Sequence, residues 1–266
     1  MPESSKRPVR VGVQIAPQHA PYEKIRDTAA ALEGAGVDIL FNWDHFFPLS
    51  GEPDGLHFES WTMLAALAEQ THRVELGALV NCNSYRNANL QADMARTIDH
   101  ISAKGGTGRF IFGTGSGWFE RDYEEYGYDF GTAGSRLNAL AANVPVIVDR
   151  WGKLNPPPTR KIPILIGGGG EKKTLKIVAT HADIWHSFSD VPTLEHKLGV
   201  LGNWCSEVGR SIGDIEISTE LRDRTIDEAD DLVDRGATLF TLGISGPEYD
   251  LAPAIDWLAW RDSKNA

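Results

Sequence analysis

The sequence predicts an α/β fold in which eight parallel strands alternate with helices and close into a (β/α)8 barrel. Short apolar runs alternate with longer segments of helical periodicity along the chain. Eight such units favour a closed barrel over an open sheet. Polar and glycine-rich clusters follow the ends of several of these runs, which is where barrels of this kind collect their ligand-binding residues.

The elements follow from periodicity, taken in chain order. Strands are expected where β-branched and apolar residues form short runs, at residues 9–15, 37–41, 74–80, 109–112, 164–166, 183–186, 215–220 and 238–242. Helices are expected where apolar residues recur every three to four positions, at residues 22–35, 58–71, 90–103, 135–151, 172–181, 193–208, 226–235 and 249–261. Gly36 and Gly236 are expected to end two helices. Pro145 is expected to bend the fourth helix or break it in two.

Length and charge limit the classes of function. The chain has 266 residues, and its only linker-like patch, at residues 155–159, is too short to separate domains, so residues 1–266 are expected to form a single domain. A net charge of −11 argues against general nucleic-acid or anionic-membrane partners. No apolar run approaches the ~20 residues of a membrane-spanning helix.

The cellular compartment follows from the N-terminus and the cysteines. Residues 1–8 are polar and do not resemble a secretion signal. Cys82 and Cys205 are expected to be free thiols, which indicates a reducing cytoplasm. No metal site is expected, because the sequence has no closely spaced histidine pair and no CxxC.

The stretch at residues 163–174 is the strongest candidate for a ligand site. A short apolar run, four glycines and the start of a helix follow one another there. Such an arrangement presents free N–H groups at the positive end of a helix dipole, and the missing Cβ atoms allow close approach, so it predicts a phosphate cradle. The alternative is a flexible loop with no ligand. Basic residues expected to crowd this stretch are Arg160, Lys161, Lys172 and Lys173.

Two further clusters follow strands. His45 stands beside Asp44 in an aromatic segment, where it could give a hydrogen bond or a proton to a heteroaromatic ligand with Asp44 orienting it. The alternative is a rim histidine satisfied by a backbone carbonyl. The polar side chains of residues 79–86 either contact the edge of a planar ligand or form hydrogen bonds with one another in a loop. Cys82 has no evident base, so a nucleophilic role is not expected. The glycines at residues 113–117 are expected in a loop that needs close backbone packing.

Taken together, five motifs in the same order resemble the bacterial luciferase-like flavin superfamily, and within it most closely the coenzyme F420-dependent oxidoreductases. The resemblance runs from about residue 9 to residue 261. The motifs are Asn42-Trp-Asp-His-Phe46, Asn83-Ser-Tyr-Arg-Asn87, Gly113-Thr-Gly-Ser-Gly-Trp-Phe-Glu120, Tyr126-Gly-Tyr128 and Pro163-Ile-Leu-Ile-Gly-Gly-Gly-Gly-Glu171.

The resemblance implies a TIM barrel that holds a deazaflavin, coenzyme F420, at its C-terminal mouth, with FMN as the alternative cofactor. The ring would rest on a bulge at Leu79 and Val80, joined by a cis peptide bond, with Asn81 and Cys82 beside it. His45 corresponds to a histidine near the reacting side of the ring. The expected phosphate loop consists of Gly167, Gly168, Gly169, Gly170, Glu171 and Lys172, and the expected substrate contacts are Trp43 and Trp118.

Two departures from the family bear on the substrate. Trp118 stands where sugar-phosphate dehydrogenases of the family carry a glutamate, and the segment before the fifth strand is shortened. The expectation is a cytoplasmic, homodimeric F420-dependent oxidoreductase that moves a hydride between deazaflavin C5 and a small organic substrate, more as a reductase than as a dehydrogenase. The alternatives are an FMN-dependent monooxygenase using reduced flavin and O2, and a non-catalytic protein that binds flavin or deazaflavin.

Overall fold

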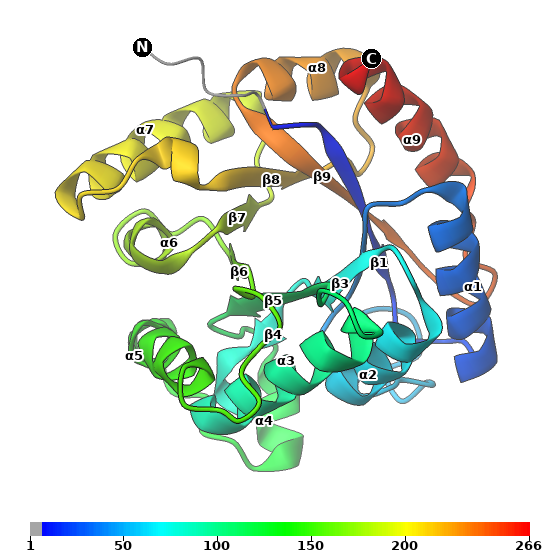
Figure 1. Ribbon diagram of the computed structural model, residues 1–266, viewed down its shortest axis with the longest axis horizontal. Coiled ribbons are helices and arrows are strands. Elements are labelled where there is room, and N and C mark those ends of the chain that lie inside the picture. Colours follow the sequence, from blue (N-terminus) through cyan, green and yellow to red (C-terminus); the bar gives the residue numbers. More distant parts are fainter. Residues whose placement is uncertain (1–6) are drawn as a thin grey trace.

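The computed structural model describes residues 7–266 and shows a closed barrel of eight parallel strands surrounded by helices, which confirms the predicted fold (Figure 1). Residues 1–6, part of the polar N-terminal segment, lie outside the described residues. Around the barrel the strands are β1 (Arg10–Ile15), β2 (Ile39–Asn42), β3 (Glu75–Ala78), β5 (Phe110–Gly115), β6 (Ile164–Gly167), β7 (Ile184–Ser187), β8 (Glu216–Glu220) and β9 (Ala237–Ile244).

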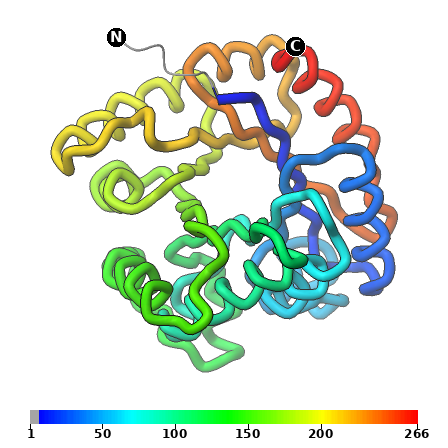
Figure 2. Tube along the Cα trace, in the orientation of Figure 1, coloured from blue at the N-terminus to red at the C-terminus, as the bar shows by residue number. Residues whose placement is uncertain are grey.

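The barrel closes between its first and last strands. All six residues of β1 pair in parallel with residues 239–244 of β9, and β3 pairs with β5 to complete the circle. Figure 2 shows the blue first strand lying beside the orange segment near the C-terminus. Because every strand runs in the same direction, all the strand C-termini meet at one mouth.

The third barrel strand is interrupted where a bulge was expected. It stops at Ala78 and resumes as β4 (Asn81–Cys82), which pairs with β5 through Asn81 and Thr114. Leu79 and Val80 lie between the two parts, and the peptide bond that joins them is cis, as expected. A 3-10 turn, η1 (Asn83–Tyr85), follows.

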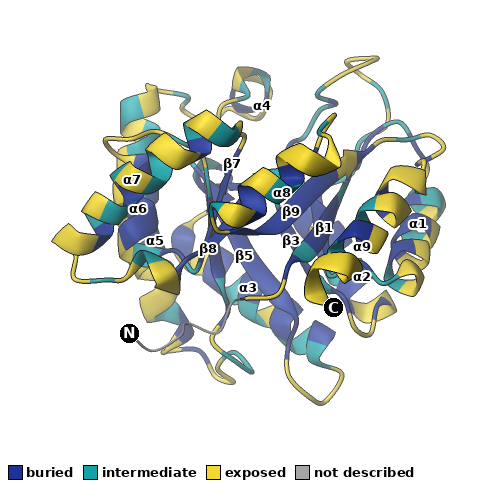
Figure 3. Ribbon diagram, turned by 90° about the horizontal axis from the view of Figure 1, so that it is seen from above, coloured by how far each residue is buried: buried dark blue, intermediate teal, exposed yellow. Residues whose placement is uncertain are grey.

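The helices cover the outside of the barrel, with buried inner faces and exposed outer faces (Figure 3). They are α1 (Tyr22–Ala35), α2 (Ser60–Gln70), α3 (Ala88–Ala103), α4 (Glu120–Tyr126), α5 (Ala133–Trp151), α6 (Thr174–His181), α7 (Val191–Glu207), α8 (Ile226–Asp234) and α9 (Ala252–Asn265), with a short turn η2 (Ile212–Asp214). Within residues 7–266, none of them has the length and apolarity that a bilayer crossing requires.

Pro145 does not divide its helix. α5 runs as one element through the proline, so of the two expected outcomes the break is excluded and the bend stays a prediction. A capping box formed by Thr132 and Ser135 satisfies its first turn, and buried residues on both sides of the proline, including Val144 and Ile147, hold it against its neighbours. Tertiary packing therefore outweighs the hydrogen bond that proline cannot donate.

The short helix α4 was not predicted. The residues that favour the two ends of a helix are present in the sequence. Glu120 and Asp122 occupy the first turn, and Gly127 ends the helix with a φ of 70°. Seven residues are too few for a clear apolar period, which is why the pattern did not reveal it.

Apolar side chains fill the barrel and support the bulge. Six buried residues form the inner cluster, and Leu79 and Val80 pack against it from the mouth side. The members of that cluster are Ile39, Phe41, Ile111, Leu165, Ile184 and Leu239. Leu79 and Val80 therefore form the upper layer of the barrel core and the floor of the space at the barrel mouth.

Candidate active site

A cavity of about 570 Å³ lies at the C-terminal mouth of the barrel. Most of the residues singled out from the sequence line it: Trp43, Asp44, His45, Leu79, Val80, Asn81, Cys82, Gly167, Gly168 and Trp118. Gly169, Gly170, Glu171 and Lys172 do not. Residues that line it without having been proposed as site residues include Gln14, His186, Phe188 and Glu220.

His45 is held by a carboxylate from α4. Its Nδ1 lies 2.7 Å from Asp122 Oδ2, and that oxygen also accepts a hydrogen bond from the Tyr85 hydroxyl at 2.8 Å. The other Asp122 oxygen accepts from the backbone N–H of Phe46 at 3.1 Å. Because a carboxylate accepts, Nδ1 carries the proton, and Nε2 has no partner within residues 7–266. The ring therefore offers Nε2 to the cavity.

Aromatic residues confine the His45 ring. Trp118 and Phe119 meet it edge to face, with ring centroids 5.6 and 5.4 Å away. Trp118 is itself 63% exposed at the mouth, and Phe188, from the other side of the cavity, is 72% exposed. Two large aromatic side chains thus stand free at the entrance, where an organic ligand can contact them.

Asp44 does not orient His45, which corrects the sequence-based interpretation. Its buried carboxylate accepts from both terminal nitrogens of Arg86, at 2.6 and 3.0 Å, and from the backbone N–H of Cys82 at 3.1 Å. A buried carboxylate needs such partners, because leaving a charge unpaired in the interior is costly. Asp44 therefore ties the end of β2 to the segment after the bulge. The orienting residue, Asp122, lies on the helix that the sequence did not reveal.

Close packing around the bulge explains the glycines of β5 and β6. A Cβ atom on Gly115 would lie 2.8 Å from Val80 Cγ2, and one on Gly167 would lie 3.1 Å from Val80 Cγ1. On Gly113 a Cβ would meet the Ala78 carbonyl oxygen at 1.9 Å. The expected close packing is thus confirmed, although Gly113 and Gly115 belong to β5 and not to a loop.

The Cys82 thiol is buried beside the bulge. Its Sγ lies 3.1 Å from the Tyr123 hydroxyl, and burial raises the pKa of the thiol to about 11. At neutral pH it is therefore protonated, and a thiol in this state is a poor nucleophile. Both cysteines are free, as expected.

Two buried polar atoms of the cavity lining have no hydrogen-bond partner within residues 7–266. They are Asn81 Oδ1 and His186 Nε2. The other polar atom of each side chain has a hydrogen-bond partner. Asn81 Nδ2 donates to the Gly113 carbonyl at 2.8 Å, and His186 Nδ1 lies 2.8 Å from Ser218 Oγ. Burial lowers the pKa of His186 to about 4, so its ring is neutral at pH 7. Unpaired buried atoms of this kind are suited to a ligand with a polar edge.

The glycine loop leaves β6 toward α6. Gly168 has a φ of 117°, a conformation that glycine adopts without strain, and its N–H donates to the His186 carbonyl at 2.9 Å. The N–H groups of Gly169 and Gly170 have no acceptor within residues 7–266. These features suit the expected phosphate cradle, which stays a prediction.

A lysine that the sequence did not single out covers this loop. Lys197, from α7, donates to the Gly169 carbonyl at 2.5 Å, and Glu171 pairs with His196 at 3.1 Å and with Lys197 at 3.7 Å. No local pattern links α7 to the glycines, since the contact joins residues 28 positions apart.

Two basic residues lie at the wrong end of the barrel to serve the loop. Arg160 and Lys161 precede β6, and the strand carries the glycines to the opposite mouth. Arg160 pairs with Glu75 at 2.7 Å, and Lys161 pairs with Asp183. The expectation that they crowd the glycine stretch is therefore wrong.

Comparison with known proteins agrees with this architecture. The family model of luciferase-like monooxygenases matches residues 5–240. The chain belongs to this family. Within it, the pyrimidine monooxygenase RutA of Pseudomonas syringae pv. syringae (strain B728a) is 32% identical over 141 residues, which cover 51% of this chain and 38% of RutA. The match thus spans well under two thirds of that relative.

Solved structures share the luciferase-like fold over nearly their whole length. An F420-dependent secondary alcohol dehydrogenase in complex with an F420–acetone adduct superposes with a TM-score of 0.81 at 15% identity, covering 94% of this chain and 97% of that one. The coenzyme F420-dependent tetrahydromethanopterin reductase from Methanopyrus kandleri gives 0.74 at 16% identity, covering 95% and 97%. The monooxygenase RslO1 from Streptomyces bottropensis gives 0.73 at 13% identity, covering 96% and 98%.

Proposed function

We propose that this chain is a coenzyme F420-dependent oxidoreductase that acts as a reductase on a small organic acceptor. The observation that carries the proposal is the geometry of His45. Asp122 fixes Nδ1 of the ring, and Nε2 faces a cavity of about 570 Å³. A histidine held in this way is suited to give a proton to a bound substrate.

The cavity residues fit a flavin-type group. Leu79 and Val80 form an apolar floor, and Gly115 and Gly167 leave the neighbouring walls without side chains. The unpaired polar atoms of Asn81 and His186 suit hydrogen bonds with the edge of a heteroaromatic ring. When bound, coenzyme F420 supplies a hydride at C5.

His45 would serve the proton side of the reaction. When the ring is protonated, Nε2 holds a proton that can pass to the substrate atom left negative by reduction. Asp122 keeps Nε2 turned toward that atom by holding the ring at Nδ1. Trp118 and Trp43 border the space in which that substrate atom would lie. Their indole rings can orient an acceptor and limit the access of water.

The carboxylates favour reduction over alcohol oxidation. Within residues 7–266, the acidic residues lining the cavity are Asp44 and Glu220. Asp44 is paired with Arg86, and Glu220 lies 2.8 Å from Arg222. Neither carboxylate is free to transfer a proton, and Trp118 cannot do so, which leaves His45 as the proton-transferring group. We assign it the donor role of a reductase. We therefore expect reduced F420 to be consumed by an activated alkene, imine or nitro-type acceptor.

A direction assay tests the reductase assignment. Oxidation of reduced F420 is followed with a panel of such acceptors, and reduction of oxidised F420 is followed with glucose 6-phosphate. We expect turnover only in the first assay. Clear activity with the sugar phosphate would overturn the proposed direction.

The second candidate is an FMN-dependent monooxygenase, favoured by the 32% identity with a pyrimidine monooxygenase. Titration of the protein with oxidised F420 and with FMN in the same buffer separates the two. We expect tighter binding of F420, whereas equal or tighter binding of FMN would favour the monooxygenase. Tight cofactor binding without turnover of any acceptor would support a non-catalytic binding protein. The homodimer stays a prediction that light scattering can test.

A further inference from the structure

Four consecutive side chains at the end of β2, residues 42–45, are each hydrogen-bonded to a partner from another segment of the chain. The partner of Trp43 is a histidine that the proposed reaction does not use. The indole Nε1–H of Trp43 donates to His57 Nε2 at 3.2 Å. His57 does not itself line the cavity, whereas Trp43 does, so His57 reaches a bound ligand through the indole.

The hydrogen bond defines the state of the His57 ring. An indole N–H can only donate, so Nε2 accepts and the proton of the neutral ring sits on Nδ1. Burial, together with the positive charge that His45 and His19 can carry, lowers the pKa of His57 to about 4. The ring is therefore neutral at pH 7, and its Nε2 stays able to hold the indole.

Main-chain hydrogen bonds fix His57 from both sides. The Phe58 N–H donates to the Pro17 carbonyl at 3.0 Å. The His19 N–H donates to the Leu56 carbonyl at 2.8 Å. The loop between β1 and α1 thus sets the position of the imidazole, and the imidazole in turn sets the position of the indole at the end of β2.

Trp118, the other tryptophan that lines the cavity within residues 7–266, is held differently. Its side chain is 63% exposed, and its Nε1–H has no acceptor among the described residues. Trp43 is half-buried and turns its N–H edge to His57, so the apolar surface of its rings is what it can offer the cavity. A flat unsaturated group packs well against such a surface.

We propose that His57 is a positioning residue, which holds the Trp43 indole as a preformed wall for an acceptor with a flat, unsaturated body, such as an aryl group conjugated to the reducible bond. The inference rests on the proposed function. A side chain that is held before binding does not have to be ordered by the ligand, and such ordering costs a factor of about 2–10 in affinity. His57 therefore acts on the binding of the acceptor and less on the chemical step.

Paired acceptors test the inference on the full-length protein with reduced F420. An aryl and a small alkyl member are compared within each class of acceptor, namely enones, imines and nitro compounds. In His57→Phe, which keeps a planar ring but cannot accept a hydrogen bond, KM for the aryl acceptor should rise by about fivefold, with kcat within about twofold of wild type. KM for the alkyl acceptor should change little.

Two further variants are matched to His57→Phe. His57→Gln should restore most of the wild-type KM, because its Oε1 can accept the indole N–H. His72→Phe replaces an exposed histidine that precedes β3 and should behave as wild type. An unchanged KM for the aryl acceptor in His57→Phe would overturn the inference and leave the proposed function intact. Failure of reduced F420 to be consumed by any of the three classes would overturn the proposed function, and the inference with it.

A double-mutant cycle separates positioning from a structural role of His57. Trp43→Phe removes the indole N–H, so adding His57→Phe to it should change KM for the aryl acceptor by less than about twofold. The dissociation constant of the cofactor should stay within about twofold of wild type in all these variants. If His57→Phe raised KM as much in the Trp43→Phe background as in the wild type, His57 would not act through the indole and the inference would be wrong. His57→Leu applies the same test if His57→Phe does not fold.

Discussion

Asp122 decides how His45 is presented to the cavity. In Asp122→Asn the side chain keeps its size but loses the charge that holds Nδ1–H. We expect turnover to fall by about 10²-fold, as for His45→Phe, while the dissociation constant for the cofactor changes little. Steady-state kinetics and cofactor titration check both values.

A second variant of the same cluster separates the positioning of His45 from a general structural role of Asp122. Tyr85→Phe removes a second donor to the same carboxylate without touching His45 and should cost less. An Asp122→Asn enzyme with wild-type turnover, or a Tyr85→Phe loss as large as that of Asp122→Asn, would sink the positioning role.

In the protein without ligand, His186 makes the free energy of unfolding depend on pH. Burial lowers its pKa from 6.5 to about 4, so the unfolded chain takes up this proton at a higher pH than the folded chain. The free energy of unfolding should therefore fall as the pH drops from 6.5 toward 4, by up to about 3 kcal/mol from this residue. Urea unfolding at a series of pH values measures the loss.

The matched variants are His186→Gln and His72→Gln. Glutamine at position 186 cannot take up the proton, so its unfolding free energy should vary less across this window. His72 is an exposed residue whose side chain is 77% accessible, and its replacement should leave the wild-type slope. A His186→Gln slope equal to that of the wild type would contradict the assignment.

At the residue scale the sequence singled out a histidine that lines the cavity but gave it the wrong partner. His45 stood out because it follows a strand in an aromatic segment, and the same local view paired it with its neighbour Asp44. Asp122 is 77 positions away, on a helix of seven residues, so no spacing rule connects it to His45. In the folded protein Asp44 pairs with Arg86 and not with His45, and the spacing of these residues along the chain does not predict that pair.

At the scale of elements, the glycines of β5 are structural requirements of the bulge. In Gly113→Ala the new Cβ would meet the backbone oxygen of Ala78 at 1.9 Å, and backbone cannot move aside as a flexible side chain can. We expect a loss of about 3 kcal/mol or more in unfolding free energy, together with weaker cofactor binding, because Ala78 directly precedes the bulge. Chemical denaturation and cofactor titration measure the two effects.

Gly199→Ala is the control for this substitution. Gly199 lies in α7, and a Cβ atom added to it would have no neighbour within 4 Å outside its own helix backbone. Alanine there should raise the unfolding free energy by about 0.5–1 kcal/mol, because it restricts the unfolded chain and favours the helix. If both variants had the same stability, the close-packing account of Gly113 would be wrong.

The elements that the sequence predicted best are those with strong periodicity. The eight barrel strands and their long helices appear in the expected order, with ends displaced by a few residues. α4 was missed because it is short. The choice between a bend and a break at Pro145 could not be made, because burial on both sides of the proline is not visible in the sequence. The bulge at Leu79 and Val80 followed from the family resemblance and not from periodicity, which favoured one continuous strand.

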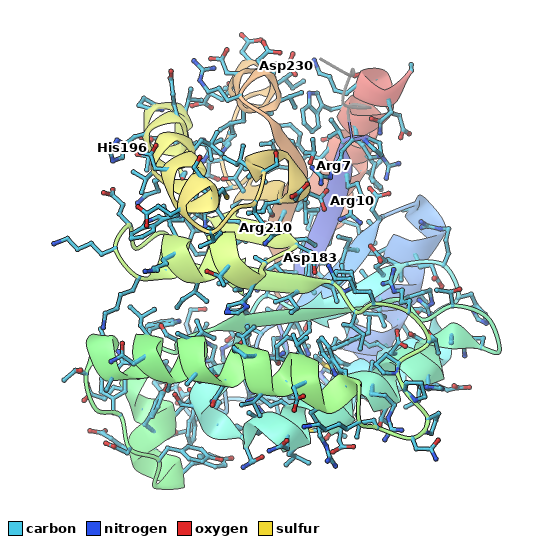
Figure 4. The ribbon with its side chains drawn as sticks, turned by 60° about the vertical axis from the view of Figure 1, so that its left-hand side comes forward. Arg7, Arg10, Asp183, His196, Arg210 and Asp230 are labelled. Carbon is cyan, nitrogen blue, oxygen red and sulfur yellow. The ribbon has the colours of Figure 1, made fainter. Side chains whose placement is uncertain are left out.

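At the scale of the whole molecule, one end of the barrel holds the cavity and the other end holds an ion-pair network. The mouth carries the cavity, while the opposite end is closed by an ion-pair network at the first residues of three strands. Arg10 on β1 donates to Glu75 on β3 at 2.7 Å and to Glu216 on β8 at 2.5 Å. Arg10 is labelled on its strand in Figure 4. Such a network joins strands from separate parts of the chain, far from the site of chemistry.

Removing Arg10 should therefore cost stability and not ligand binding. Arg10→Ala leaves the nearly buried Glu216 without its cation, whereas Glu75 keeps its ion pair with Arg160, and we expect a loss of about 2–4 kcal/mol in unfolding free energy. Neutralising Glu216 as well, in Arg10→Ala with Glu216→Gln, should recover part of that loss, because Glu75 still pairs with Arg160 and no carboxylate of the network is left without a cation. The dissociation constant of the cofactor should stay within about twofold of wild type in both variants, since the bulge and the glycine loop lie at the other end of the strands. A large change in cofactor affinity with unchanged stability would contradict the claim that this end of the barrel serves stability and the mouth serves ligand binding.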